Sequence, residues 1–546
     1  MSRIHSRMSI LKEVDFKLSS RIRPFYYNYL SQHVKPNIFD NILSLLFTNN
    51  FNQDIEIIEK NAGNFFFHYN EKQRFLKILS NYFPDYLEST LAQANQVVSH
   101  VFDVLGSGPI HLGSHIDWHQ DIKSGFRWAP SYYKKIKHIN LNDSSDIKMP
   151  WELSRFHHFN TLGRAYWISG DEKYAKEFVN QLIDWTNCNP PRIGINWRCS
   201  MEVAIRLINW ISAYFFFNHS PFFTNEIKTI FFKNILIHQL HIYHNLEFGY
   251  RSRTDGIPRN GNHFMTDLIG LVFPYFIFPS LASKRIYRKS LNWLYQEIDL
   301  QINPDGVHYE LSIGYHRLIT EILLAIVLIM KKNNIQLSDF IINKIQKMVD
   351  FVLAYTKPDG YTPQARDADN SRLISFTDNH VNDHRYLLNI GAVLFNRSDF
   401  KSAARSFSHE ALWWLGPSGF NKFLSIKEDK NTNGSKIFSY SGFCFMKQNG
   451  DYLMNLCAKG GMDGYGAHGH NDVLSFEIFT NGRSVLVDPG TYVYTAYPDW
   501  RNTFRSTAYH NTIRIDRVEI NKLDPKRLFS LDEKAHPEIE KWVCKK

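Results

Sequence analysis

Hydrophobic residues recur with a helical period through the middle of the chain. Between residues 200 and 217 the apolar side chains from Met201 to Ile211 follow i, i+3, i+4 spacing. The same period, broken by short polar or Gly/Pro stretches, predicts further helices at 154–169, at a segment ending at Trp185, and at 223–246, 263–278, 283–302, 312–332, 337–356 and 380–396. About nine helices with short turns favour stacked antiparallel hairpins, in a solenoid or a closed toroid.

After about residue 431 the hydrophobic period changes to two, which is typical of strands. Strands are predicted at 437–447, 452–458, 473–480, 484–487 and 511–516, with a type I′ hairpin at Asn481-Gly482. The chain is therefore an α+β multidomain protein, with an antiparallel β-sandwich packed on the helices. We divide it into an N-terminal helical extension (1–100), a helical domain (101–430) and a β domain (431–546).

Composition narrows the class of protein. Hydrophobic residues make up 44% and charged residues 21% of the chain, as in globular proteins, and no apolar run suggests a membrane span. The N-terminus lacks the apolar stretch of a signal peptide, which predicts a cytoplasmic location, with a periplasmic one as the alternative. The five cysteines lack the spacing of a disulfide framework or a zinc-thiolate site.

The net charge of +10 favours a polyanionic partner. No zinc-finger spacing, RNA-binding signature or dense basic run is present, so nucleic acid is not expected. An acidic polysaccharide fits the charge equally well, and the aromatic content of 15% fits either sugar stacking or core packing. The sequence does not define an oligomeric state.

The segment before the third predicted strand carries the densest chemistry. In an extended backbone His468, His470 and Asp472 would share one face, which continues from Leu474 to Ile478 as the expected core side. Polar groups directed at a core need partners. Three together indicate a metal site, a proton-transfer site, or both.

Three further groups of residues carry candidate chemistry. Asn262 lies where a predicted helix begins, so it either caps that helix or binds a carboxylate there. Tyr315 follows a Pro-Asp-Gly turn and is either a general acid, since phenols stay protonated near neutral pH, or a packing residue. His470, Asp488 and His510 predict a zinc site, with hydrogen-bonded core histidines as the alternative.

Six segments in this order resemble the heparinase II/III family of polysaccharide lyases. They are NWRCSMEVAIRLINW (196–210), RNGNHF (259–264), NPDGVHYELSIGYH (303–316), ARDADNSR (365–372), GAHGHNDVLSFEIFTNGRSVLVDPGTY (466–492) and FRSTAYHNTIRID (504–516). The resemblance implies an N-terminal incomplete α/α toroid followed by a C-terminal antiparallel β-sandwich. It also implies β-elimination at a uronic acid of an acidic polysaccharide, such as a heparin- or heparan-like glycosaminoglycan.

The resemblance also implies residue roles. Asn262 would hold the substrate carboxylate, Tyr315 would act as acid, with a base role as the alternative, and His468 would act as base. His470, Asp488 and His510 match the family's metal-binding positions, which implies a structural zinc and no organic cofactor. The alternative places His510 in the catalytic centre. The predicted groove residues are Trp197, Glu202, His263, Arg366 and Arg505. The alternative role of each is structural, through an ion pair, a hydrogen bond or packing.

Two departures from the family pattern keep other functions open. The β region is shorter than is usual for the family, so its last strands are expected to be missing, and the signal peptide of degradative relatives is absent. These features favour, as an alternative, a carbohydrate-binding or surface-polysaccharide biosynthesis protein with weak or no lyase activity. A toroidal hydrolase is another alternative, and its two carboxylates would come from Glu202, Glu310 and Asp369.

Overall fold

The structure is a computed structural model that describes residues 51–251, 258–429 and 434–543. The first 50 residues of the predicted N-terminal extension lie outside this part. The extension continues in three described helices, α4 (Phe51–Lys60), α5 (Lys72–Tyr82) and α6 (Pro84–Val98). Two small antiparallel pairs are β1 (Val101–Phe102) with β2 (Ile110–His111), and β3 (Tyr250–Arg251) with β4 (Pro258–Arg259).

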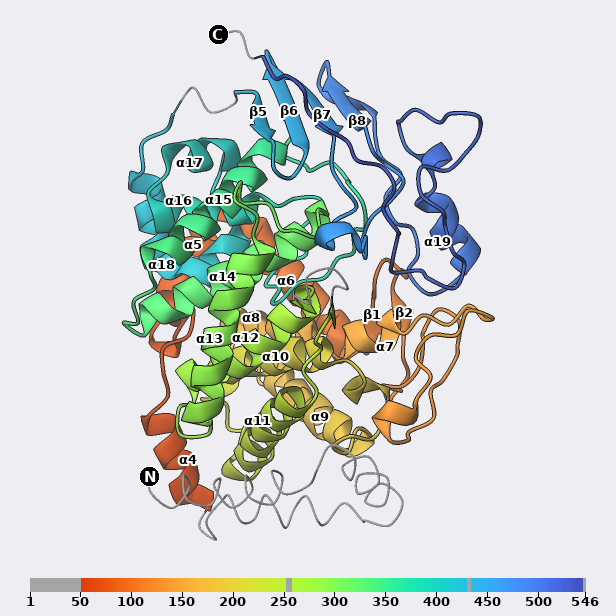
Figure 1. Ribbon diagram of the computed structural model, residues 1–546. Coiled ribbons are helices and arrows are strands. Elements are labelled where there is room, and N and C mark those ends of the chain that lie inside the picture. The colour runs from red at the N-terminus through yellow and green to blue at the C-terminus, as the bar shows by residue number, and fades with distance from the viewer. Residues whose placement is uncertain (1–50, 252–257, 430–433, 544–546) are drawn as a thin grey trace.

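A helical domain occupies most of the described chain (Figure 1). Its helices are α7 (Lys148–Leu153), α8 (His157–Ser169), α9 (Lys173–Cys188), α10 (Ser200–Phe217), α11 (Asn225–His244), α12 (Asn262–Ile277), α13 (Lys284–Gln301), α14 (Ile313–Lys332), α15 (Asp339–Tyr355), α16 (Arg385–Phe395), α17 (Ser398–Ala404) and α18 (His409–Ser425). Each predicted helix is present, and α7, α17 and α18 are additional. Serine side chains at 283, 312 and 338 cap α13, α14 and α15.

The even-numbered helices from α8 to α18 form the inner ring of a toroid. Along this ring α8 packs on α10, α10 on α12, α12 on α14, α14 on α16 and α16 on α18, while α5 contacts both α18 and α8. Every residue of α10 is buried, and α14 is buried along nearly its whole length. The odd-numbered helices α13 and α15 bury one stripe each, because they cover the ring from outside.

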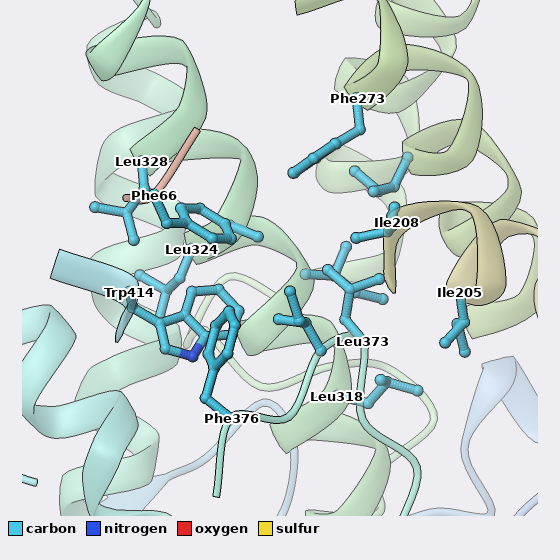
Figure 2. Packing of buried hydrophobic residues seen from close by; sticks show 14 of the residues in the cluster. Phe66, Ile205, Ile208, Phe273, Leu318, Leu324, Leu328, Leu373, Phe376 and Trp414 are labelled. Carbon is cyan, nitrogen blue, oxygen red and sulfur yellow. The ribbon is translucent and has the colours of Figure 1, made fainter. Parts of the chain in front are cut away.

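The aromatic residues mostly fill this ring. Phe66, which precedes α5, inserts between α14 and α18, where it packs against Trp414 with ring centroids 4.9 Å apart. Figure 2 shows Leu324 and Leu328 of α14 beside these rings, with Phe376 below them. The aromatic content therefore reflects core packing more than exposed sugar-stacking surface.

Among the described residues, one helix is long and apolar enough to cross a membrane by length and composition. This helix is α14, and 94% of its most apolar window is buried inside the protein. Its hydropathy is explained by its place in the inner ring, where neighbouring helices surround it.

The C-terminal domain contains a five-stranded antiparallel sheet in the order β5-β6-β7-β8-β9. Its strands are β5 (Lys436–Phe438), β6 (Phe443–Gln448), β7 (Asp451–Leu456), β8 (Ser475–Thr480) and β9 (Arg483–Leu486). Asn481 and Gly482 both have positive φ, 50° and 75°, as the predicted type I′ hairpin requires. The sheet lies against α15, where Phe351 contacts Phe438, Phe443 and Phe445 (Figure 1).

Two strand predictions are corrected by the structure. The segment 437–447 is two strands, because a turn with Gly442 at φ 79° separates β5 from β6. No strand forms at 511–516, where the Asn511 side chain, rather than a backbone ladder, donates to the Phe476 and Val487 carbonyls. The remaining strand predictions differ from the structure only at their ends.

The expected core face of β8 is also wrong. Leu474 adopts φ 64°, which breaks the extended backbone and moves the alternation by one residue. Consequently Ser475, Glu477 and Phe479 face the helical domain and are buried, while Leu474 is exposed. The fold class itself is confirmed: a helical toroid is followed by an antiparallel β domain. The boundaries at residues 101 and 431 remain predictions.

Candidate active site

The three predicted catalytic residues come from three separate elements. Asn262 is the first residue of α12, Tyr315 lies in the first turn of α14, and His468 belongs to the loop before β8. The N-cap Ser312 accepts a hydrogen bond from the Tyr315 backbone N–H, which fixes the start of α14. Two helix beginnings and one loop of the β domain therefore meet at this place.

Glu310 connects Asn262 with His468. The Asn262 side-chain nitrogen donates to both carboxylate oxygens of Glu310, at 3.0 and 3.2 Å, and its backbone N–H donates at 2.8 Å. His468 Nε2 lies 3.9 Å from Glu310 Oε2. Burial acts to raise the pKa of Glu310, but His308, His468 and the Asn262 hydrogen bonds outweigh it and leave that pKa below its ordinary value.

His468 is held between a carboxylate and a phenol ring. Its Nδ1 donates to Asp367 Oδ2 at 2.9 Å, and its ring stacks on Tyr315 with centroids 3.8 Å apart. Because Nδ1 carries the hydrogen, a neutral imidazole has its lone pair on Nε2, on the side of Glu310. This is the tautomer that a general base requires.

Asp367 is a fully buried carboxylate with three partners. Arg501 donates to both of its oxygens, one of them at 2.6 Å, and His470 Nε2 donates to Oδ1 at 2.8 Å. Burial acts to raise the Asp367 pKa, but Arg501 and the hydrogen bonds from His468 and His470 hold it well below the ordinary value. Asp367 therefore stays ionised and keeps His468 oriented.

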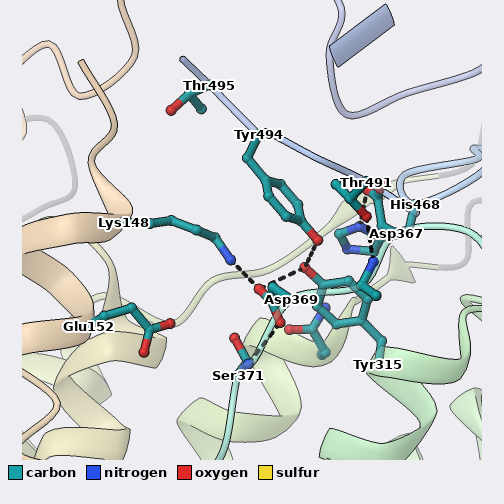
Figure 3. A network of polar contacts seen from close by, with 12 residues as sticks. Lys148, Glu152, Tyr315, Asp367, Asp369, Ser371, His468, Thr491, Tyr494 and Thr495 are labelled. Carbon is teal, nitrogen blue, oxygen red and sulfur yellow. Dashed lines mark hydrogen bonds and ion pairs between the residues drawn. The ribbon is translucent and has the colours of Figure 1, made fainter. Parts of the chain in front are cut away.

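The Tyr315 hydroxyl belongs to a second polar network (Figure 3). It lies 3.1 Å from the Tyr494 hydroxyl and 3.4 Å from Asp369 Oδ2. Lys148 forms an ion pair with Asp369, and its ammonium lies 4.2 Å from the centre of the Tyr494 ring. Burial, followed by the nearby carboxylates, raises the Tyr315 pKa well above its ordinary value, so the phenol stays protonated and can donate a proton.

The predicted metal ligands also come together. One ligand atom from each of His470, Asp488 and His510 lies within 4.8 Å of the others. His470 Nδ1 and His510 Nε2 are buried ring nitrogens with no hydrogen-bond partner in the described chain, while the opposite nitrogen of each ring donates to a carboxylate. This arrangement leaves a lone pair on each ring for a metal, so the residues fit a metal ion.

Asp472 does not join that group. It is fully buried and lies 3.4 Å from the Arg366 guanidinium, so it pairs with an arginine instead of sharing a face with the two histidines. Residues 466–474 form turns and bends and the strand begins only at Ser475, so alternate residues of this segment do not share one face.

Four of the five predicted groove residues are buried in the structure. Trp197, Arg366 and Arg505 are 0% exposed and Glu202 is 4% exposed. Trp197 packs against Trp185 and His238, and Glu202 binds Arg155. Arg366 and Arg505 each donate to backbone carbonyls. In the structure these four side chains therefore make internal contacts. Only the fifth, His263, has a solvent-accessible side chain, 47% exposed.

Sequence reasoning missed Lys148, Asp367, Tyr494 and Arg501 and gave Glu310 a different role, as a hydrolase carboxylate. Asp367 lies in the segment ARDADNSR, next to the predicted Arg366. The side chains that donate hydrogen bonds to its carboxylate lie 101 to 134 positions away in the sequence. Tyr494 and Lys148 carry no local motif. Only the three-dimensional arrangement identifies them.

Two regions of the chain match the N-terminal and the C-terminal parts of one protein family. Residues 52–386 match "Heparinase II/III N-terminus", and residues 430–541 match "Heparinase II/III-like, C-terminal". A heparin-sulfate lyase of Bacteroides stercoris is 27% identical over 419 residues, which cover 69% of this chain and 55% of that protein. One of Pedobacter heparinus is 26% identical over 402 residues, covering 70% and 55%. The chain thus spans about half the length of these curated relatives.

Solved structures support the fold. A heparinase III structure has a TM-score of 0.55 at 17% identity, covering 87% of this chain and 72% of that one. Another has a TM-score of 0.52 at 23% identity, covering 79% and 62%. Both likenesses concern the arrangement of the toroid and the β domain.

Proposed function

The chain belongs to the heparinase II/III family, and from this premise we propose that it is a polysaccharide lyase. Its substrate is an acidic, uronic-acid-containing polysaccharide such as a heparin- or heparan-like glycosaminoglycan, which it cleaves by β-elimination. The names of the relatives, heparin-sulfate lyases, support this substrate class. The positive net charge of +10 is favourable for a polyanion.

One observation carries the proposal: an amide, a phenol and an imidazole from distant parts of the chain converge. Asn262 bonds Glu310, Glu310 lies 3.9 Å from His468, and His468 stacks on Tyr315. Elimination at a uronate needs these three kinds of group, because the carboxylate must be bound, the C5 proton removed and the leaving oxygen protonated.

In the proposed mechanism Asn262 binds the substrate carboxylate. An amide nitrogen carries two hydrogens, so one can remain on Glu310 while the other meets the uronate and stabilises the charge that develops during proton removal. His468, held by Asp367, takes the C5 proton on Nε2. Tyr315 then protonates the glycosidic oxygen that leaves, and Tyr494 lies within hydrogen-bond distance of the Tyr315 hydroxyl.

We also propose that the metal at His470, Asp488 and His510 is zinc with a structural role. The ion would connect the loop before β8 to the segment around residue 510, because it would bind ligands from both. Two imidazoles and a carboxylate are ligands that zinc accepts. His470 would then be fixed on one side by the metal and on the other by Asp367.

The hydrolase alternative has little support from the carboxylates. Glu202 is bonded to Arg155 at 2.6 and 2.7 Å, and Asp369 forms its ion pair with Lys148. Burial acts to raise the Asp369 pKa, but Lys148 keeps it well below the ordinary value, so Asp369 is unsuited to donate a proton at neutral pH.

The test uses the full chain with heparin, heparan sulfate and other uronate polymers. β-Elimination adds no water, so product masses sum to the parent mass, and each new non-reducing end is an unsaturated sugar that absorbs in the ultraviolet. Tyr315→Phe should lower kcat by about 10²–10⁴-fold, because it removes the proposed acid while leaving the ring stacked on His468. Products heavier by one water per cut would indicate hydrolysis. Binding without turnover in both proteins would favour the scaffold alternative.

A further inference from the structure

A second group of metal-ligating side chains lies apart from the proposed catalytic residues and the first metal site, and it includes His263, a predicted groove residue. Cys199 is the N-cap residue of α10, Glu247 follows α11, and His263 is the second residue of α12. Cys199 Sγ lies 3.5 Å from Glu247 Oε2 and 3.7 Å from His263 Nδ1, and His263 Nδ1 lies 2.8 Å from Glu247 Oε2. Thiol, carboxylate and imidazole therefore meet at one point.

These separations are close to those of a tetrahedral zinc centre. Zinc bonds of ordinary length at tetrahedral angles place sulfur about 3.5 Å from oxygen, sulfur about 3.6 Å from nitrogen, and nitrogen about 3.3 Å from oxygen. The two sulfur separations agree with these values. The nitrogen–oxygen pair is shorter because His263 and Glu247 are hydrogen-bonded, and a metal would need it to widen by about half an ångström.

We propose that Cys199, Glu247 and His263 form a second metal site, which binds a zinc-type divalent cation. Thiolate and imidazole select zinc or cobalt over magnesium or calcium, which prefer oxygen ligands. A thiolate and a carboxylate together balance the two positive charges of the ion. Three protein ligands leave a fourth position, which solvent can reach because the His263 side chain is 47% exposed.

Neighbouring contacts hold the ligands in place. The Met201 backbone N–H donates to Glu247 Oε2 at 3.4 Å, and the Glu247 backbone N–H donates to Asp267 Oδ2 at 2.7 Å. Asp267 lies in α12, so the segment carrying Glu247 is tied to the same helix as His263. A bound ion would join the beginnings of α10 and α12, directly beside Asn262.

Cobalt provides a test that does not use activity. The full chain is stripped of metal with a chelator and titrated with Co²⁺, while the near-ultraviolet absorption of a thiolate–cobalt bond is followed. The His470, Asp488 and His510 group contains no sulfur, so this band reports only a cysteine site. We expect the unchanged protein to show the band. Cys199→Ser should lose the band and should bind one equivalent of cobalt less. Cys188→Ser, which removes an exposed thiol, should keep the band.

The proposal is overturned if the unchanged protein shows no band, or if the band survives Cys199→Ser. Should Cys199→Ser fail to fold, Glu247→Gln keeps the thiol and removes one charged ligand, and it should shift the cobalt titration to higher concentration. An unshifted titration would also overturn the site. Because no readout uses lyase activity, failure here is distinct from failure of the proposed function.

Discussion

At the scale of single residues, the site depends on buried charges that compensate one another. Asp367 and Arg501 are both fully buried, and each is the main partner of the other. Removing one member of such a pair leaves an uncompensated charge in the interior, which costs far more than the net contribution of the pair.

We predict that Arg501→Leu lowers the free energy of unfolding by about 3–5 kcal/mol, because Asp367 loses its counter-ion. Urea unfolding followed by circular dichroism measures this change. Arg483→Leu, at an exposed position of β9, is the matched control and should be nearly neutral. Adding Asp367→Asn to Arg501→Leu should restore part of the stability, and an equally unstable double variant would contradict the charge argument.

A second residue-scale prediction concerns pH. His316 is fully buried, with Nδ1 accepting from the His308 backbone N–H at 3.1 Å and Nε2 donating to the Met348 carbonyl at 3.1 Å. Burial lowers the His316 pKa to about 3. The folded protein therefore keeps this ring neutral while the unfolded chain protonates it below about pH 6.5. Stability from His316 is complete above that pH and is lost as the pH falls toward 3.

His316→Gln should accordingly flatten the fall of unfolding free energy between about pH 6.5 and about pH 4, by up to about 1.4 kcal/mol per pH unit. Urea titrations at several pH values give the slope. His115→Gln, at an exposed position, serves as control and should leave the slope unchanged. Equal slopes in His316→Gln and the unchanged protein would show that His316 titrates normally.

The sequence located the proposed catalytic groups, but not the residues that hold them in place. Asn262, Tyr315 and His468 lie in recognisable segments, and the structure brings them together. Asp367 and Arg501 are 134 residues apart, and neither the period nor a motif pairs them. Aromatic rings suit both cores and sugar-binding grooves, so the sequence leaves both roles open for Trp197. The structure places its ring in the core.

At the scale of elements, the hydrophobic pattern located the helices, because the outer helices α13 and α15 bury one stripe each and the inner helices are long apolar segments between polar breaks. The strand interpretation failed where single residues change the backbone. Leu474 at φ 64° moves the buried face of β8 by one position, and Gly442 divides one predicted strand into two. Such left-handed residues leave little trace in hydrophobicity, since leucine at this position reads as an ordinary strand residue.

Close packing of α10 on α12 gives an element-scale prediction. A Cβ at Gly270 would lie 2.6 Å from the Ala204 Cβ and 3.0 Å from Ile242 Cδ1. Gly270→Ala should therefore cost about 1–3 kcal/mol of unfolding free energy, measured by urea denaturation. Gly434→Ala meets no atom within 4 Å and is the control. Adding Ala204→Gly should recover part of the loss, and no recovery would place the strain elsewhere.

At the scale of the whole molecule, the proposed active site lies where the two domains meet. Asn262 and Tyr315 belong to the toroid, while His468 belongs to the β domain, so their geometry depends on how the sheet lies on α15. Phe351 is the centre of that contact, with the Phe438 and Phe443 rings 4.9 and 5.0 Å away. The resemblance to the family predicted the two domains, but the sequence pattern could not place one against the other.

We predict that Phe351→Ala lowers the free energy of unfolding by about 3–5 kcal/mol, because it leaves a cavity between the toroid and the sheet. Hydrogen exchange should rise first in β5 and β6. Phe340→Ala, on the exposed side of the same helix, is the control and should change little. Faster exchange confined to α15, with the sheet unaffected, would count against a shared interface.

The Asp367 carboxylate accepts four hydrogen bonds from three side chains, and this has a consequence for how the sequence can vary. One carboxylate orients His468, fixes the tautomer of His470 and neutralises Arg501. Substitutions at these three donors should be epistatic, because each change alters what the remaining two experience. Lineages that lose the proposed metal ligand His470 would then also change the surroundings of the proposed base His468, so we expect both features to be inherited or lost together.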